Sequence, residues 1–244
     1  MPTKIETAHA MLDLAGVTAK DVVYDLGSGD GILPIEAAKR YGVPSYGIEY
    51  NSDLVALSER NAKREGVEHL TRFKRGDIFA EDFSRATVVT LYLGEALNSR
   101  LMPKLLEMPA GTRVVSNTFR MDAWMPDKEI ILPSGDQAYL WIVPAAVSGR
   151  WRLHGPPGLE GGLLFINQKK QLFDGRIELN KSRSFLIDAG RLRGNVIQFE
   201  FLDDQKNRYQ FTGEVINQEL VGRFEQPSIG SITFKKAFSI EKTR

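Results

Sequence analysis

The chain of 244 residues contains no cysteine. This excludes disulfides, thiolate nucleophiles and cysteine-ligated metals, and it suits a reducing compartment such as the cytoplasm. The three histidines lie far apart and lack any metal-ligand spacing. No apolar run reaches the length that crosses a membrane, and residues 1–20 do not resemble a signal peptide. We therefore expect a cytoplasmic protein without a membrane span or a bound metal.

Charge of either sign is nearly balanced over the whole chain, with a formal net charge of +1. It is unevenly spread, because residues 1–148 carry 16 Lys and Arg against 20 Asp and Glu, whereas residues 149–244 carry 16 against 11. The basic half has no arginine-rich run and no repeat of aromatic and basic residues. A nucleic-acid partner is therefore not expected, and a scattered, solvated surface is the interpretation we favour.

The first part of the chain alternates between two kinds of apolar pattern. Short β-rich runs are followed by segments with helical period, which predicts right-handed crossovers and a mostly parallel sheet covered on both faces. The predicted strands are 22–25, 44–49, 71–74, 87–93, 112–117 and 138–144, and the predicted helices are 32–41, 52–65 and 95–106. This is a doubly wound α/β domain, which we place at residues 1–148.

Residues 149–244 show a different pattern, in which helical periods are absent. Ile197, Phe199 and Phe201 alternate with polar residues, as expected for half-buried strands. Hairpin connections are predicted at 174–175, 194–195 and 203–207. The second domain is therefore expected to be a small antiparallel β-barrel or sandwich.

The stretch VVYDLGSGDG, from Val22 to Gly31, joins a predicted strand to a predicted helix. Its glycines, Gly27, Gly29 and Gly31, leave backbone amides open to a ligand at a helix N-terminus, with Ser28 between the first two. A dinucleotide-binding loop requires a small residue where this chain has Ile32. In addition, Asp25 would repel a pyrophosphate, whereas the ammonium and sulfonium of S-adenosylmethionine would favour a carboxylate there.

Two further acidic residues follow the loop at suggestive distances. Glu49 ends the second predicted strand in YGIEYN, and Asp77 follows the third in KRGDIF. With the glycine loop, they resemble the motifs of class I S-adenosylmethionine-dependent methyltransferases. The resemblance implies that Asp25 holds the ammonium, Glu49 the ribose hydroxyls, and Asp77 with Ile78 the adenine. Considered alone, Asp77 is also compatible with a helix N-cap.

Longer stretches resemble a narrower group. PTKIETAHAMLDLAGVTAKDVVYDLGSGDG, GIEYNSDLVALSERNAKREGV and the segment 86–124 are similar to prokaryotic relatives of the mitochondrial protein-lysine methyltransferases. The likeness covers about residues 2–144 and implies a seven-stranded mixed sheet, with six parallel strands and one antiparallel. It also implies methyl transfer from S-adenosylmethionine to an amine acceptor, such as a protein lysine. Further cofactor contacts implied by it are Thr3, Tyr50, Asn51, Leu91 and Tyr92.

The acceptor is less well defined. Ile32 stands where the group has arginine, and the segment near Gly94 lacks its proline. Tyr92 and Glu95 follow the fourth predicted strand, where open α/β sheets bind ligands, and are the candidate catalytic residues. Each also has a purely structural interpretation, Tyr92 in packing and Glu95 as the first-turn acid of a helix. A small-molecule N- or O-methyltransferase and a cofactor-binding interaction protein without turnover remain alternatives, and the oligomeric state is not determined.

Overall fold

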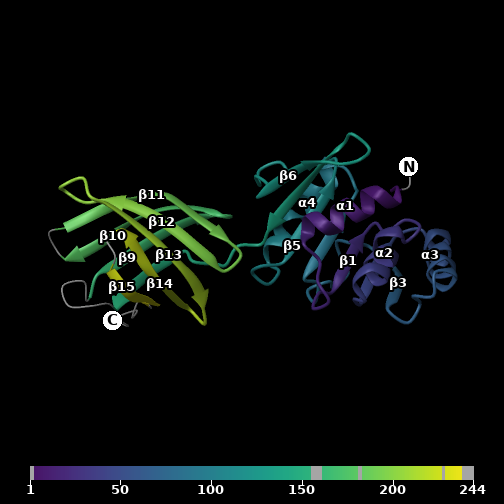
Figure 1. Ribbon diagram of the computed structural model, residues 1–244, viewed down its shortest axis with the longest axis horizontal. Coiled ribbons are helices and arrows are strands. Elements are labelled where there is room, and N and C mark those ends of the chain that lie inside the picture. Colours follow the sequence, from purple (N-terminus) through teal and green to yellow (C-terminus); the bar gives the residue numbers. More distant parts are fainter. Residues whose placement is uncertain (1–2, 155–160, 181–182, 227–228, 238–244) are drawn as a thin grey trace, which may run out of the picture. The chain divides into compact units, whose positions relative to one another are not determined.

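The computed structural model describes residues 3–154, 161–180, 183–226 and 229–237 (Figure 1). The chain divides into two compact units, residues 1–143 and 144–244. Each unit is described below by itself. The domain limits 1–148 and 149–244 stay a prediction, because a division by contacts does not show which part folds independently.

The first unit contains a seven-stranded sheet with the order β3-β2-β1-β4-β5-β7-β6. Neighbours from β3 to β5 pair in parallel, and β7 pairs antiparallel with both β5 and β6. The strands are β1 (Val23–Leu26), β2 (Ser45–Glu49), β3 (Thr71–Arg75), β4 (Val88–Leu91), β5 (Arg113–Asn117), β6 (Lys128–Ile131) and β7 (Gln137–Ile142). The predicted doubly wound mixed sheet is confirmed, while the edge strand β6, which buries little, was not anticipated from the sequence.

Helices cover both faces of this sheet (Figure 1). They are α1 (Ile5–Ala15), α2 (Ile32–Tyr41), α3 (Ser52–Arg64) and α4 (Glu95–Leu106). Because side chains alternate along a strand, Val88 packs in one core with α1 and α2, whereas its neighbour Val89 packs in the other with α4. No helix among the described residues is long and apolar enough to cross a membrane.

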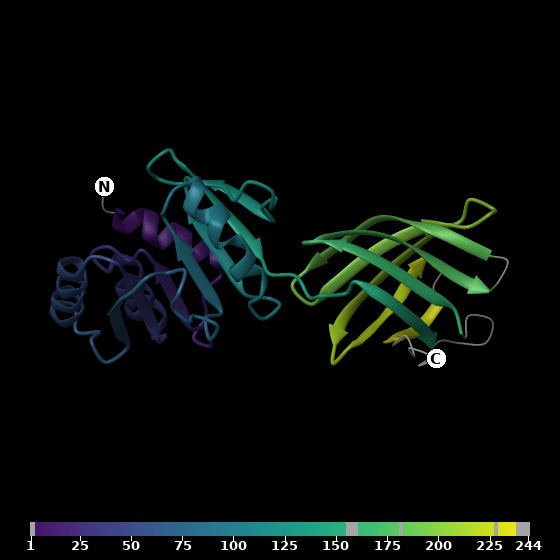
Figure 2. The ribbon, with the colours of Figure 1, turned by 180° about the vertical axis from the view of Figure 1, so that it is seen from behind.

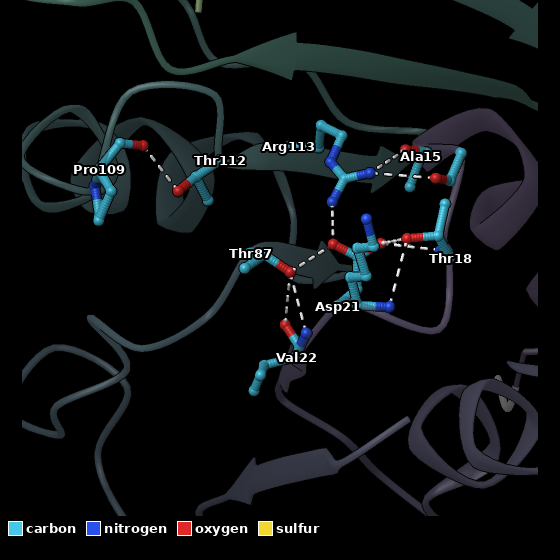
Figure 3. A network of polar contacts seen from close by, with 10 residues as sticks. Ala15, Thr18, Asp21, Val22, Thr87, Pro109, Thr112 and Arg113 are labelled. Atoms are coloured by element: carbon cyan, nitrogen blue, oxygen red, sulfur yellow. Dashed lines mark hydrogen bonds and ion pairs between the residues drawn. The ribbon is translucent and has the colours of Figure 1, made fainter. Parts of the chain in front are cut away.

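A polar network lies at the amino ends of the central strands (Figure 3). Asp21 precedes β1, and one of its carboxylate oxygens accepts hydrogen bonds from the Thr87 hydroxyl (2.7 Å) and from Arg113. The other oxygen accepts from the backbone N–H of Thr18 (2.8 Å). Arg113 also donates to the carbonyl of Gly16 (3.0 Å), beyond the end of α1. The network therefore joins α1 to the starts of three strands.

Asp21 is ionised at the pH values at which the protein folds. Burial by itself raises the pKa of Asp21, but hydrogen bonds from Thr87, Thr18 and Arg113 outweigh it and hold the pKa below its ordinary value. A carboxyl group with a lowered folded-state pKa adds stability above its unfolded pKa, and this stability is lost as the pH falls.

The second unit is a closed antiparallel barrel with the strand order β10-β11-β12-β13-β14-β15-β8-β9 (Figure 2). The strands are β8 (Gly149–His154), β9 (Leu163–Lys169), β10 (Leu172–Asn180), β11 (Arg183–Arg193), β12 (Val196–Leu202), β13 (Arg208–Ile216), β14 (Glu219–Gln226) and β15 (Ile229–Lys236). Its interior is filled by aromatic rings, such as Phe199 and Phe211, whose centroids are 4.9 Å apart. A closed sheet of this size has room for side chains and little else.

One predicted hairpin was wrong. Residues 174–175 lie inside β10, and the turn between β9 and β10 is at 170–171 instead. Gly175 is small because a Cβ there would lie 2.0 Å from the carbonyl oxygen of Phe165 on the neighbouring strand. The glycine therefore marks a close approach of two backbones and not a turn. The connections at 194–195 and 203–207 are confirmed.

Replacement of Arg113 tests the network at the start of the sheet. Arg113→Met leaves the buried Asp21 carboxylate without its cation, so the free energy of unfolding at neutral pH should fall by about 2–3 kcal/mol. Urea unfolding measures this change. Arg120→Met, which removes an exposed ion pair with Glu129, is the control and should have little effect. Equal loss in both variants would contradict the role assigned to the network.

Candidate active site

The glycine loop, residues 27–31, connects the carboxyl end of β1 to α2. The backbone N–H groups of Gly27 and Ser28 donate to the carbonyl of Ile48 on β2, at 2.8 and 3.2 Å. Gly31 is the N-cap of α2 and has a φ of 84°. The turn is therefore tied to the neighbouring strand before the helix begins.

Two of the glycines are required for different reasons. A Cβ at Gly31 would lie 2.8 Å from side-chain atoms of Phe73 and Ser58, so no larger residue fits there. Gly29 has a φ of 56°, and a Cβ there would meet no atom within 4 Å. Gly29 thus borders open space, where a bare backbone permits close approach of a ligand.

Helix α3 holds the outer side of the loop. The Ser58 hydroxyl donates to the carbonyl of Gly29, and the Asn61 side-chain amide donates to the carbonyl of Asp30, both at 2.9 Å. Neither residue was identified from the sequence. Their spacing of three places both on one helix face, which is the only signal that the sequence offered.

A cavity of about 450 Å³ opens beside the loop. Of the residues predicted to bind the cofactor, it brings together Thr3, Asp25, Gly27, Ser28, Gly29 and Tyr92. Its remaining lining residues were not predicted; they are Asp30, Ile32, Leu33, Leu54 and Leu57. The apolar part of the wall thus comes mainly from the helices that flank the loop.

Asp25 is the most perturbed titratable group in this cavity. Its side chain is buried, and its Oδ1 accepts a hydrogen bond from the Thr90 hydroxyl (2.7 Å). Burial raises the pKa of Asp25 to about 7 against that hydrogen bond, and the carboxylates of Glu49 and Asp30 raise it further. No cation of the described chain pairs with it. A cationic ligand would supply the missing partner.

Glu49 lies at the end of β2 with both carboxylate oxygens engaged by backbone. Oε2 accepts from the N–H of Gly29 (3.0 Å), and Oε1 accepts from the N–H of Asn51 (2.9 Å). Each oxygen retains a second lone pair. Glu49 therefore fixes the glycine loop and can still accept hydrogen bonds from hydroxyl groups.

Ser28 carries an orphaned polar atom in the wall of the cavity. The residue is buried, and its Oγ has no hydrogen-bond partner among the described residues. A buried hydroxyl without a partner is unfavourable by about 1–3 kcal/mol. Together with the open space at Gly29 and the unpaired carboxyl of Asp25, it fits a ligand that carries both polar and cationic groups.

The other predicted cofactor residues lie around the cavity without lining it. Tyr50 is exposed, and the Asn51 side chain caps α3 by accepting from the N–H of Asp53 (2.8 Å). Asp77 is exposed and accepts from the N–H of Phe79 (2.9 Å), so it caps a turn and not a helix. The last two, Ile78 and Leu91, belong to the core beneath α4, partly and fully buried respectively.

The edge beyond β4 and β5 is partly aromatic. The rings of Tyr92 and Phe119 stack with centroids 5.8 Å apart, and Tyr92 remains 38% exposed. The buried Asn98 of α4 holds this edge, since its amide donates to the Ser116 hydroxyl (2.9 Å) and to the carbonyl of Phe119 (3.0 Å). Glu95 is exposed in the first turn of α4.

The chain turns sharply after β5. Thr118 has a φ of 65°, which is unfavourable for a β-branched residue. Strained backbone of this kind is concentrated at functional sites. Trp124, by contrast, is buried in the core and receives a hydrogen bond at its carbonyl from the indole of Trp141 (2.8 Å). It anchors its loop and does not cover the cavity.

Known proteins share this arrangement. A model of the ANTKMT methyltransferase domain matches residues 25–128. A protein-lysine N-methyltransferase of Saccharolobus islandicus is 37% identical over 148 residues, which are 59% of this chain and 92% of that protein. A lysine N-methyltransferase of Caenorhabditis elegans, whose name specifies a component of ATP synthase, is 39% identical over 52% of this chain and 67% of its own length.

A solved structure is also similar. The RNA methyltransferase of Salinibacter ruber, crystallised with S-adenosyl-L-homocysteine, is 46% identical and has a TM-score of 0.58. The match covers 60% of this chain and 96% of that one. These relatives therefore leave two fifths or more of the present chain without a counterpart.

The raised pKa of Asp25 predicts an unusual pH dependence of stability. Between the unfolded value near 4 and the folded value of about 7, the folded state binds the extra proton, so stability falls as the pH rises through this window. Asp25→Asn keeps the acceptor for Thr90 and removes the charge. At about pH 8 it should stabilise the ligand-free protein on the order of 3 kcal/mol, and much less at about pH 4.

Urea unfolding at both pH values measures this difference. Asp53→Asn, at the exposed start of α3, is the matched control and should keep the pH dependence of the natural protein. A destabilised Asp25→Asn variant at pH 8 would show that the carboxylate has a partner after all.

Proposed function

The chain belongs to the class I S-adenosylmethionine-dependent methyltransferases that carry the ANTKMT methyltransferase domain, and from this we propose that it methylates a lysine amine of a protein. The family resemblance, the fold and the cofactor predicted from the sequence are confirmed. The enzyme class is thereby established, which disfavours a protein that binds the cofactor without turnover. Support for a lysine acceptor comes from the two relatives whose names specify lysine.

The cavity offers partners for each part of S-adenosylmethionine. In this proposal the Asp25 carboxylate faces the cationic methionine end, and the backbone at Gly29 lies along it. Glu49 accepts hydrogen bonds from the ribose hydroxyls through its remaining lone pairs. Asp77 and Ile78 are assigned to the adenine by the family motif, and Thr3 lies at the cavity wall ahead of α1. When bound, the cofactor supplies a methyl group activated by its sulfonium.

The protein then has to align and deprotonate the acceptor. A lysine amine attacks only when neutral, and a site that excludes water lowers its pKa. Tyr92, stacked on Phe119, gives an apolar wall for the aliphatic stem of a lysine. Glu95 lies one turn away, where it attracts the ammonium and accepts its proton directly or through water.

A second acceptor class, RNA, is favoured by one observation. The Salinibacter ruber protein is described as an RNA methyltransferase and is 46% identical over nearly its whole length. Small-molecule acceptors have no comparable support. Lysine remains the first proposal because no amide- or base-gripping motif of the N/D-P-P-Y/F type follows β4, where residues 91–98 are LYLGEALN.

A methyl group at Gly29 should block the cofactor. Gly29→Ala places a Cβ in the open space of the cavity, so the affinity for S-adenosylmethionine should fall at least about ten-fold by calorimetry. Gly66→Ala is the matched control, because Gly66 has a φ of 73° and equally open surroundings outside the cavity. Both variants should lose similar stability, and unchanged affinity in Gly29→Ala would reject the assigned site.

The acceptor is identified by following the label. Tritiated methyl from S-adenosylmethionine should enter the protein fraction of a lysate, resist nuclease, and appear as methyl-lysine after hydrolysis. Label released by nuclease would instead establish the RNA acceptor. Glu95→Gln should lower kcat about 100-fold or more without changing cofactor affinity. Glu107→Gln, beyond the other end of α4, is its control, and equal activity of the two variants would remove Glu95 from the mechanism.

A further inference from the structure

The barrel presents opposite charges on opposite sides. Outward-facing cations gather on β15, β8, β9 and β10, and we call this set the basic face; it comprises Lys235, Arg152, Arg150, Lys169 and Arg176. The carboxylates of Asp174 and Glu178 are fewer on the same strands. Around the closed ring, β13 lies across from β9. The strands β12 to β14 carry Glu200, Glu214, Glu219 and Glu225 outward, with Arg208 and Arg223.

Strand register brings the cations of the basic face side by side. Arg152 pairs with Lys235 of β15, and Arg150 pairs with Phe165 of β9, which in turn pairs with Arg176 of β10. Alternate residues on one strand are about 7 Å apart and neighbouring strands about 5 Å. These separations are within a Debye length at physiological salt, so the positive potentials add.

Two of these cations have no acidic partner. Arg150 and Arg152 are exposed and form no ion pair within the part of the chain that the structure describes. Lys235, in contrast, pairs with Glu219 at 3.1 Å. The basic face therefore retains uncompensated positive charge available to an anionic partner.

Arg176 adds a planar platform to this charge. Its guanidinium lies 3.9 Å from the centroid of the partly buried Phe165 ring, and its Nε donates to Glu178 at 2.8 Å. The stack and the hydrogen bond fix the guanidinium plane, yet 47% of the Arg176 side chain stays exposed. Unstacked nucleobases pack on guanidinium planes and aromatic rings of this kind.

We propose that the basic face of the barrel binds single-stranded nucleic acid, with Arg150 and Arg152 on phosphates and a base stacked on the Arg176–Phe165 pair. An acidic protein would need the charges but not the fixed plane, so the platform favours nucleic acid. The proposal concerns binding by the barrel and does not depend on which acceptor the first unit methylates.

The test compares probes that differ in charge and in bases. Fluorescence anisotropy of the full-length protein measures binding to a labelled, unstructured RNA of about 20 nucleotides, longer than the roughly 4–16 that one barrel of an oligonucleotide-binding fold covers. Arg150→Gln with Arg152→Gln should reduce the slope of log affinity against log salt by about 1.4. Arg208→Gln with Arg223→Gln removes the same charge from the opposite side and should leave the slope nearly unchanged.

A second variant separates the plane from the charge. Arg176→Lys keeps the cation and removes the plane, so RNA affinity should fall about five-fold or more while affinity for inorganic polyphosphate stays the same. The proposal is overturned if RNA does not bind at low salt, if both double variants act equally, or if Arg176→Lys affects neither polymer. Polyglutamate that competes as well as RNA would indicate an acidic protein partner instead. Unchanged S-adenosylmethionine affinity and melting temperature show that each variant is folded.

Discussion

The position of the candidate site depends on how β2 holds the loop that follows β1. The carbonyl of Ile48 accepts the N–H groups of Gly27 and Ser28, and the carboxylate of Glu49 accepts that of Gly29. Parallel pairing places these strand ends together, so residues more than 20 positions apart form one turn. The same glutamate thus shapes the loop and borders the cofactor, which links the local fold directly to ligand recognition.

Two aspartates at opposite ends of the central strands show what environment does to one side chain. Asp21 has a cation and several donors, its pKa is lowered, and it stabilises the fold. Asp25 has one donor and no cation, and burial raises its pKa to about 7. An unpaired buried carboxyl destabilises the ligand-free protein, and its retention is understandable where a cationic ligand completes the site.

The two units use different surfaces for different partners. In the first unit, a concave cavity at the carboxyl edge of a parallel sheet is formed by loops and helix starts, as in other open α/β sheets. In the barrel, the interior is filled by aromatic rings, so the outer faces of the strands are what remains for recognition. The relatives that match 60% or less of this chain provide no counterpart for all of it.

The sequence by itself determined the alternation of strands and helices, the glycine loop with Asp25, and the sheet end marked by Glu49, because these depend on local periodicity and backbone conformation. Only the tertiary structure placed Ser58 and Asn61 on the loop, Leu54 and Leu57 in the cavity wall, and Leu91 in the core. The sequence also predicted no nucleic-acid partner, since the cations of the basic face are scattered along the chain. Strand pairing brings them together, and pairing between distant segments leaves no local pattern to detect.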